Sequence, residues 1–171
     1  MNIGHLHVSA EATRREYAVY VMVARHRAAK NVKLYIGKTG DNREGCNPVI
    51  SRVGNHLSFN PLPAQSRNHL GDPEHYDFDF FFTSFGPYVP PSRSRSGIDL
   101  VNEMERQLNF LAQETLAQET LGKIMNPLKS SRYIPPEEKD RRNRLVTPRR
   151  MDKLNELIKT VRRFIQKTSQ K

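Results

Sequence analysis

Two tyrosines, an arginine and a histidine lie close together in the first third of this sequence: Tyr20, Tyr35, Arg52 and His56. Arg52 and His56 are spaced i and i+4, so on a helix their side chains share one face. Guanidinium, phenol and imidazole groups are types that bind phosphate and transfer protons. The structural alternative is a solvated polar helix face beside tyrosines that pack within strands.

A carboxylate further along the chain joins this set. In the segment "GIDLVNEMERQLNFLA", the apolar side chains cluster on one side of a helical projection, and Glu105 falls at the border of that cluster. Glu103 points away from it. A carboxylate at a core border is unfavourable unless it is paired or binds a metal. Glu105 is therefore a candidate metal ligand, and a single salt bridge is the alternative.

The elements that must position these residues follow from local patterns. Strands are predicted from their β-branched and aromatic content at 17–24, 31–37 and 76–85. Helices are predicted at 47–57 with Asn47 as N-cap and Pro48 in the first turn, from Ser96 to before Asn126-Pro127, and after Thr147-Pro148. The order β-β-α-β-α predicts an α+β fold with a small three-stranded antiparallel sheet flanked by helices.

Charge divides the chain unevenly. The formal net charge is +10, yet residues 1–128 hold 14 basic and 13 acidic side chains, whereas residues 129–171 hold 14 and 5. We expect a main domain at 1–130 and a basic linker with an amphipathic helix at 131–171. Such a segment favours a nucleic-acid partner first and an anionic membrane second, and a solvated tail is the alternative. The candidate nucleic-acid contacts are Arg141, Arg142, Arg144, Arg149 and Arg150.

Other functions are excluded by composition. Cys46 is the single cysteine, which excludes an internal disulfide and a multi-cysteine zinc site and favours a reducing setting. The first residues hold no signal-like apolar run, and no segment approaches the about 18 apolar residues that span a membrane. We therefore expect a cytoplasmic protein without a membrane partner, although the basic final helix could also lie on a membrane surface or bind another protein.

The order of these residues resembles the GIY-YIG nuclease superfamily between about residues 17 and 128. Tyr20 in "AVY" matches the tyrosine of GIY, and "YIG" is intact at 35–37, followed by Lys38. The later matches are an arginine and histidine in "RVGNH", a glutamate in "EMERQL" and an asparagine in "MNPL": Arg52, His56, Glu105 and Asn126. Alanine replaces the first glycine of GIY. The "NPVISR" segment resembles restriction-type or uncharacterised bacterial and phage members.

The resemblance implies a metal-dependent DNA endonuclease. Glu105 would hold Mg²⁺ or Mn²⁺, and Arg52 would contact the phosphate. Tyr20 or Tyr35 would deprotonate or orient the attacking water, assisted by the positive charge of Lys38, Arg52 or the metal. His56 would transfer a proton or position a tyrosine, and Asn126 would complete the catalytic set.

One chain offers one catalytic centre, so cleavage of both DNA strands implies a homodimer or two successive nicks. A catalytically silent nucleic-acid-binding protein on the same fold is the alternative function. The intact set of Tyr20, Tyr35, Arg52, His56 and Glu105 favours the enzyme.

Overall fold

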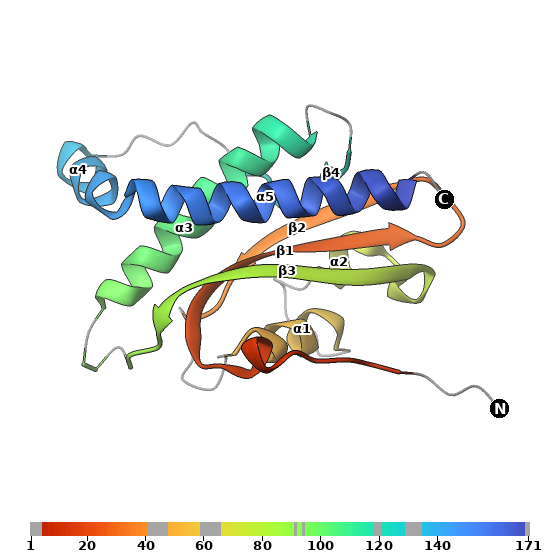
Figure 1. Cartoon of the computed structure of the whole chain (residues 1–171), viewed down its shortest axis with the longest axis horizontal. Coiled ribbons are helices and arrows are strands. Elements are labelled where there is room, and N and C mark those ends of the chain that lie inside the picture. The colour runs from red at the N-terminus through yellow and green to blue at the C-terminus, as the bar shows by residue number, and fades with distance from the viewer. Residues whose placement is uncertain are drawn as a thin grey trace.

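A computed structural model of the chain describes residues 5–40, 48–58, 66–90, 92–93, 95–117, 121–128 and 135–169. The predicted N-cap Asn47 and the cysteine Cys46 lie outside these residues. The fold class is α+β, as predicted (Figure 1).

The sheet has four strands in the order β3-β1-β2-β4. Their bounds are Glu16–His26 (β1), Val32–Lys38 (β2), Tyr76–Pro87 (β3) and Lys123–Ile124 (β4). β1 pairs antiparallel with β2 and β3, whereas β4 pairs parallel with β2. The three predicted strands therefore pair antiparallel as expected, and the prediction of three strands missed the short parallel strand β4. A two-residue strand has no local signature, because it forms only when the chain returns to the edge of β2.

Helices cover both faces of the sheet. Their bounds are Val49–Leu57 (α1), Arg67–Leu70 (α2), Ser96–Ala112 (α3), Pro136–Leu145 (α4) and Pro148–Ser169 (α5). Single turns of other helix types lie at Ala10–Thr13, Pro73–His75 and Gln113–Ala117. α3 begins at the predicted Ser96 but ends well before Asn126, because the following segment turns back to form β4.

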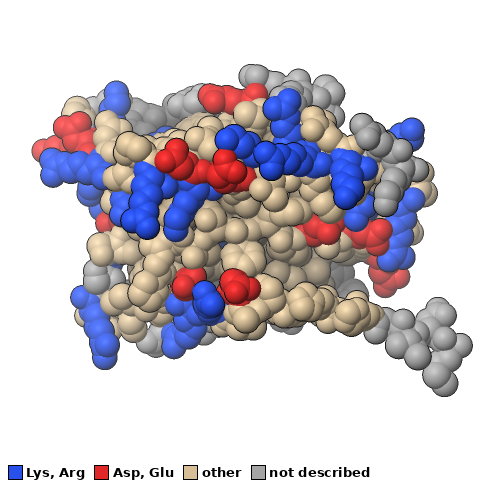
Figure 2. All heavy atoms as spheres, in the orientation of Figure 1, with Lys and Arg blue, Asp and Glu red and all other residues tan. Residues whose placement is uncertain are grey.

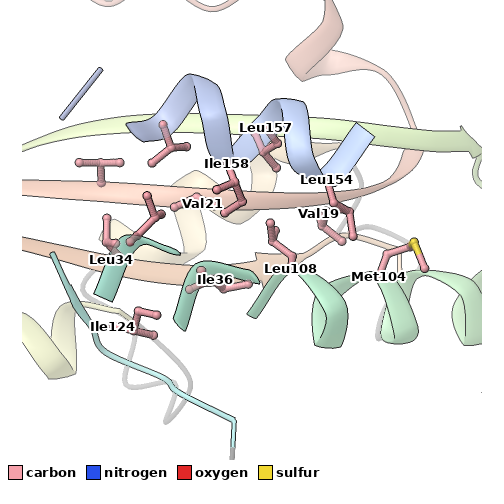
Figure 3. Close-up of a cluster of buried hydrophobic side chains, with 14 of the residues drawn as sticks. Val19, Val21, Leu34, Ile36, Met104, Leu108, Ile124, Leu154, Leu157 and Ile158 are labelled. Carbon is pink, nitrogen blue, oxygen red and sulfur yellow. The ribbon is translucent and has the colours of Figure 1, made fainter. Parts of the chain in front are cut away.

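The larger core lies between the sheet and the helices α3 and α5 (Figure 3). Alternate residues of β1 point to this side, including Val19 and Val21, and they meet Met104 and Leu108 of α3. This alternation is the two-residue period of a strand. The intervening β1 residues point to the opposite face, where α1 lies (Figure 1). There a smaller cluster joins Met22 and Ala24 to Leu70 and Tyr76.

The last helix belongs to the larger core. Its predicted apolar stripe is buried in the same cluster as the strands and α3: Leu154, Leu157, Ile158, Val161 and Ile165. Five such side chains contribute several kcal/mol of burial free energy, at roughly 1.5–3 kcal/mol each. The predicted boundary at residue 130 therefore does not separate two hydrophobic cores.

Candidate active site

Tyr20 and Tyr35 lie on the α1 face of neighbouring strands. In the register of β1 and β2, Tyr20 is opposite Gly37 and Met22 is opposite Tyr35. The Tyr20 ring covers Gly37 so closely that a Cβ at position 37 would overlap the ring and its hydroxyl. The glycine of "YIG" is therefore required by the tyrosine on the adjacent strand, rather than by the backbone conformation at that position.

His56 brings α1 to this pair of tyrosines. Its side chain is buried, with 2% exposure. The backbone N–H of Ser66 donates to Nδ1 over 3.3 Å, and Nε2 lies 2.5 Å from the hydroxyl oxygen of Tyr20. Burial, and then the positive charge of Arg52, lower the pKa of His56 to about 4. The imidazole is therefore neutral near pH 7. Because Nδ1 accepts a hydrogen bond, the ring hydrogen lies on Nε2 and is donated to the hydroxyl oxygen of Tyr20.

Electrostatic coupling links Tyr20 to the other predicted residues. Burial raises the pKa of Tyr20 far above its usual value, because the ring is fully enclosed. The charge of Arg52 and its hydrogen bond to Tyr20 oppose this rise, whereas Tyr35 and Glu105 add to it. The predicted arginine, both tyrosines and the glutamate thus influence one phenol group. The positive charge of Arg52 favours the ionised form of Tyr20.

Tyr35 is the more accessible of the two tyrosines. Its ring meets the His56 ring edge-on, with the centroids 4.7 Å apart. Tyr35 and Arg52 are each half-buried, whereas Tyr20 is fully buried. Among these side chains, Tyr35 and Arg52 are therefore the ones that a group from solvent can reach.

Lys38 and Glu105 lie at the end of β2, on the side of α3. Lys38 Nζ forms an ion pair and hydrogen bond with Glu105 Oε2. Side-chain exposures of 18% for Lys38 and 25% for Glu105 leave both groups in contact with solvent. The structure therefore shows the salt bridge that was the alternative for Glu105, and metal binding by this partly exposed carboxylate remains a prediction.

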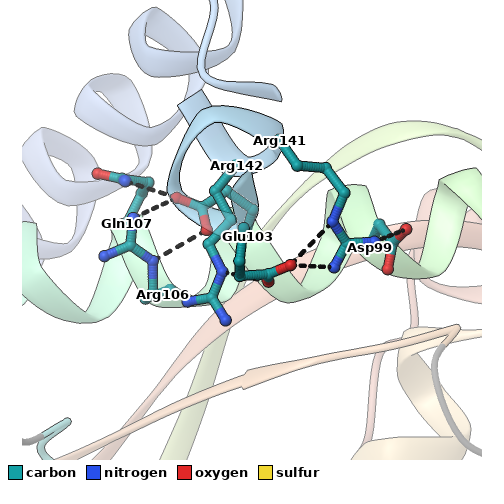
Figure 4. A network of polar contacts seen from close by, with 7 residues as sticks. Asp99, Glu103, Arg106, Gln107, Arg141 and Arg142 are labelled. Atoms are coloured by element: carbon teal, nitrogen blue, oxygen red, sulfur yellow. Dashed lines mark hydrogen bonds and ion pairs between the residues drawn. The ribbon is translucent and has the colours of Figure 1, made fainter. Parts of the chain in front are cut away.

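Glu103 has a different environment from the one expected. It lies away from the sheet, but it is buried, with 3% exposure. Arg106 Nη2 donates to its carboxylate over 2.5 Å and Gln107 Nε2 over 2.7 Å (Figure 4). Glu103 and Arg106, together with residues of α4, line a cavity of about 120 Å³. The helical projection could not show this, because it describes one helix without its neighbours.

Asn126 holds the strand that carries "YIG". Its Oδ1 accepts from the Ile36 N–H over 3.0 Å, and its Nδ2 donates to the Ile36 carbonyl over 2.7 Å. This one side chain therefore supplies hydrogen-bond partners to the backbone of β2 beyond the point where β4 ends. Asn126 is therefore a positioning residue in this structure, and a direct catalytic role remains a prediction.

Asn109 is a residue that the sequence reasoning missed. It is buried on α3, donates to the Asn126 carbonyl over 2.9 Å and accepts from the Leu128 N–H over 3.0 Å. It thereby fixes the segment that carries Asn126. An amide at the border of the apolar face of the projected helix was the available signal, because a buried amide must find hydrogen-bond partners inside the protein.

The five predicted nucleic-acid contacts lie on α4 and at the start of α5. Arg141 pairs with Asp99 and Glu138, and Arg142 pairs with Glu138 (Figure 4). Arg150 donates to the Leu145 carbonyl over 2.9 Å. The other two, Arg144 and Arg149, are exposed. Three of the five therefore have intramolecular partners, and nucleic-acid binding by this set remains a prediction.

Glu105 is the candidate carboxylate for a metal at this site. Among the described residues, no group of three or more His, Cys, Asp and Glu side chains could jointly hold an ion. Mg²⁺ commonly takes one or two carboxylates and completes its shell with waters and substrate phosphates. Glu105 is partly exposed and its charge influences Tyr20, so it fits that mode of binding, with Lys38 beside the carboxylate.

Comparison with known proteins identifies no relative: no family model, no curated protein and no solved structure matches the chain. Within the described part of the chain, none of the helices is both long enough and apolar enough to cross a bilayer.

Proposed function

We propose that this chain is a metal-dependent endonuclease of GIY-YIG type that hydrolyses DNA phosphodiester bonds. The observation that carries the proposal is the arrangement around Tyr20, whose hydroxyl oxygen is 2.5 Å from His56 Nε2 and whose pKa responds to Arg52, Tyr35 and Glu105. Residues from two strands and two helices influence this one phenol group, and their side-chain types are those that phosphodiester hydrolysis uses.

The roles follow from the environment of each side chain. Arg52 binds the phosphate, because its planar guanidinium matches two phosphate oxygens. His56 is a positioning residue: its Nε2–H group donates to Tyr20 and favours negative charge on the phenol oxygen. Glu105 would hold Mg²⁺ or Mn²⁺, and a bound ion would supply charge stabilisation to the phosphate. Lys38 keeps the Glu105 carboxylate at the end of β2.

Either tyrosine could act on the attacking water. Tyr35 is the more accessible group, and Tyr20 has the hydrogen bond from His56 and the charge of Arg52. Phenylalanine at each position removes one hydroxyl and keeps the ring. The variant whose single-turnover cleavage rate no longer depends on pH identifies the tyrosine that acts as the base.

A catalytically silent nucleic-acid-binding protein is the second candidate. Two observations favour it: Lys38 already engages Glu105, and burial raises the pKa of Tyr20. In that case Arg52 would contact phosphates without any reaction. Cleavage distinguishes the two candidates directly.

The test is nicking of supercoiled plasmid by the full chain with Mg²⁺, with Mn²⁺ and with EDTA. We expect metal-dependent nicking, either to open circles or, through a homodimer or two successive nicks, to linear DNA. Glu105→Gln should abolish it, because the amide cannot replace the charge of the carboxylate. Glu114→Gln removes an exposed charge just beyond α3 and should keep the activity. Binding without cleavage in every metal would support the silent protein instead.

A further inference from the structure

The C-terminal half of α5 has a strongly basic outer face. From Leu157 to the end of the chain there is no Asp or Glu, and the described helix carries Lys159, Arg162, Arg163 and Lys167. All four side chains are exposed, while the apolar stripe of the same helix is buried against the sheet. Figure 2 shows Lys and Arg side chains along this side of the molecule.

Few acidic groups neutralise this face. Lys159 pairs with Glu156 over 2.7 Å. Among the described residues, Arg163 and Lys167 form no ion pair. Arg163 also lies close enough to Glu156 to contribute to the lowered pKa of that carboxyl, after the hydrogen bond and charge of Lys159. The exposed cations Arg163 and Lys167 are therefore available to a partner.

The turn between β1 and β2 extends the basic face. A hollow of about 270 Å³ is lined by turn residues and by Thr168 of α5. Lys30 is exposed on its rim, whereas Arg25 and Arg27 pair with Asp79 and Asp77. We define the α5 basic surface as Lys30, Lys159, Arg162, Arg163 and Lys167.

This surface lies on the opposite side of the sheet from Tyr20, Tyr35 and His56. α5 packs on the face that bears Val19 and Val21, and His56 contacts Tyr20 on the other face. Phosphates that meet Arg52 and Tyr35 therefore cannot be the ones that meet α5. The helix axis from Lys159 to Lys167 is about 12 Å long, and duplex DNA carries about one charge per 1.7 Å of axis. The surface is thus long enough to meet several phosphates.

We propose that the α5 basic surface binds a second nucleic-acid segment, separate from the segment at the active site. Binding at α5 follows from the local charge, and the claim that it is a second segment rests on the proposed function. The protein would then hold two duplexes at once. Because each phosphate contact contributes about 0.9 to the slope of log K against log salt, three lost cations should lower the slope by about 2 to 3.

The test is capture of a fluorescent duplex by an immobilised duplex through the full-length protein, in EDTA so that no strand is cut. We expect capture by the wild type and a loss of at least 10-fold in Lys30→Gln/Arg163→Gln/Lys167→Gln, while binding of a single duplex persists. The matched control, Arg14→Gln/Arg93→Gln/Lys139→Gln, neutralises three exposed cations elsewhere and should capture like the wild type.

Each other outcome contradicts the proposal. Absence of capture by the wild type, or unchanged capture by the first triple variant, excludes α5 as a second site. Loss of all duplex binding in that variant makes α5 the single site. Binding of anionic phosphatidylserine vesicles without any duplex capture identifies a membrane surface instead. Plasmid nicking is measured independently, so a failed capture experiment leaves the endonuclease proposal standing.

Discussion

His56 joins α1 to the central strand through Tyr20, whose hydroxyl oxygen lies 2.5 Å from His56 Nε2. The other ring nitrogen accepts the Ser66 N–H over 3.3 Å. Both nitrogens of a neutral imidazole are thus used inside the protein, one as donor and one as acceptor. If the ring took up a second proton, its Nδ1–H group would need a hydrogen-bond acceptor. The group that now lies there, the Ser66 N–H, is itself a donor.

This arrangement predicts a pH-dependent stability. The folded-state pKa of His56 is about 4, against an ordinary value of 6.5. Between these values the unfolded chain binds the proton and the folded chain does not, so stability rises with pH. We expect the contribution of neutral His56 to the free energy of unfolding to be fully present above pH 6.5. As the pH falls toward 4, up to about 3 kcal/mol of it should be lost.

Urea unfolding from pH 7.5 to pH 4.5 measures this contribution. His56→Gln keeps an amide donor and acceptor but does not titrate, so the stability difference between wild type and variant should shrink as the pH falls. A difference that stays constant over that range would mean that His56 can take up its proton without loss inside the folded protein.

Gly37→Ala should disturb the site through Tyr20. The new methyl group would overlap the Tyr20 ring, and overpacking of this kind costs about 1–3 kcal/mol. We expect a lower melting temperature and loss of nicking. Gly54→Ala is the control: nothing lies within 4 Å of its Cβ position in α1, and alanine favours a helix, so stability should stay level or rise by up to about 1 kcal/mol. Equal melting temperatures for both variants would contradict the close packing.

Asn126→Ala should loosen the end of β2. It removes both hydrogen bonds to Ile36 and leaves backbone groups at a sheet edge without those partners. We expect a loss of about 1–3 kcal/mol. Hydrogen exchange of the Ile36 amide, followed by NMR, should accelerate. Asn126→Asp keeps the acceptor for Ile36 N–H but loses the donor to its carbonyl, so the amide should remain more protected than in the alanine variant.

Substitutions of the two glutamates of α3 should have different effects, one on the stability of the protein and the other on its nicking activity. Glu103→Ala removes a buried carboxylate from Arg106 and Gln107, and we expect a loss of about 2 kcal/mol in unfolding free energy with nicking retained. Glu105→Ala, at a partly exposed position, should abolish nicking with little change in stability. Nicking rates and urea midpoints of both variants test this, and an exchange of the two effects would place the metal ligand at position 103.

A chain that ends at Ser130 should not fold. It lacks α5, so the apolar surface of the sheet and α3 that now packs against Leu154 and Ile158 would be exposed to solvent. Circular dichroism of the truncated chain should show no cooperative melting. Within the full chain, Leu154→Ala should cost about 2–5 kcal/mol, whereas Lys159→Ala should change stability by less than about 0.5 kcal/mol. Cooperative melting of the truncated chain would show that α5 is dispensable for the core.

The sequence alone determined the elements that depend on local patterns. The β-branched and aromatic content of β1 and β2, the apolar period of α3 and α5, and the start of α3 near Ser96 are properties of neighbouring residues, and the structure contains these elements. The i and i+4 spacing of Arg52 and His56 likewise placed both on α1. These features could be predicted because backbone geometry sets the periods of strands and helices.

Tertiary structure decided everything that requires a distant partner. β4 exists because the segment after α3 returns to β2. Asn126 forms hydrogen bonds with the backbone of Ile36, which lies 90 positions away in the sequence. Glu103 is buried because α4 covers it, and the stripe of α5 became core because the sheet and α3 offer it an apolar surface. A single segment specifies which of its faces is apolar, but the element that will cover that face depends on the packing of the whole chain.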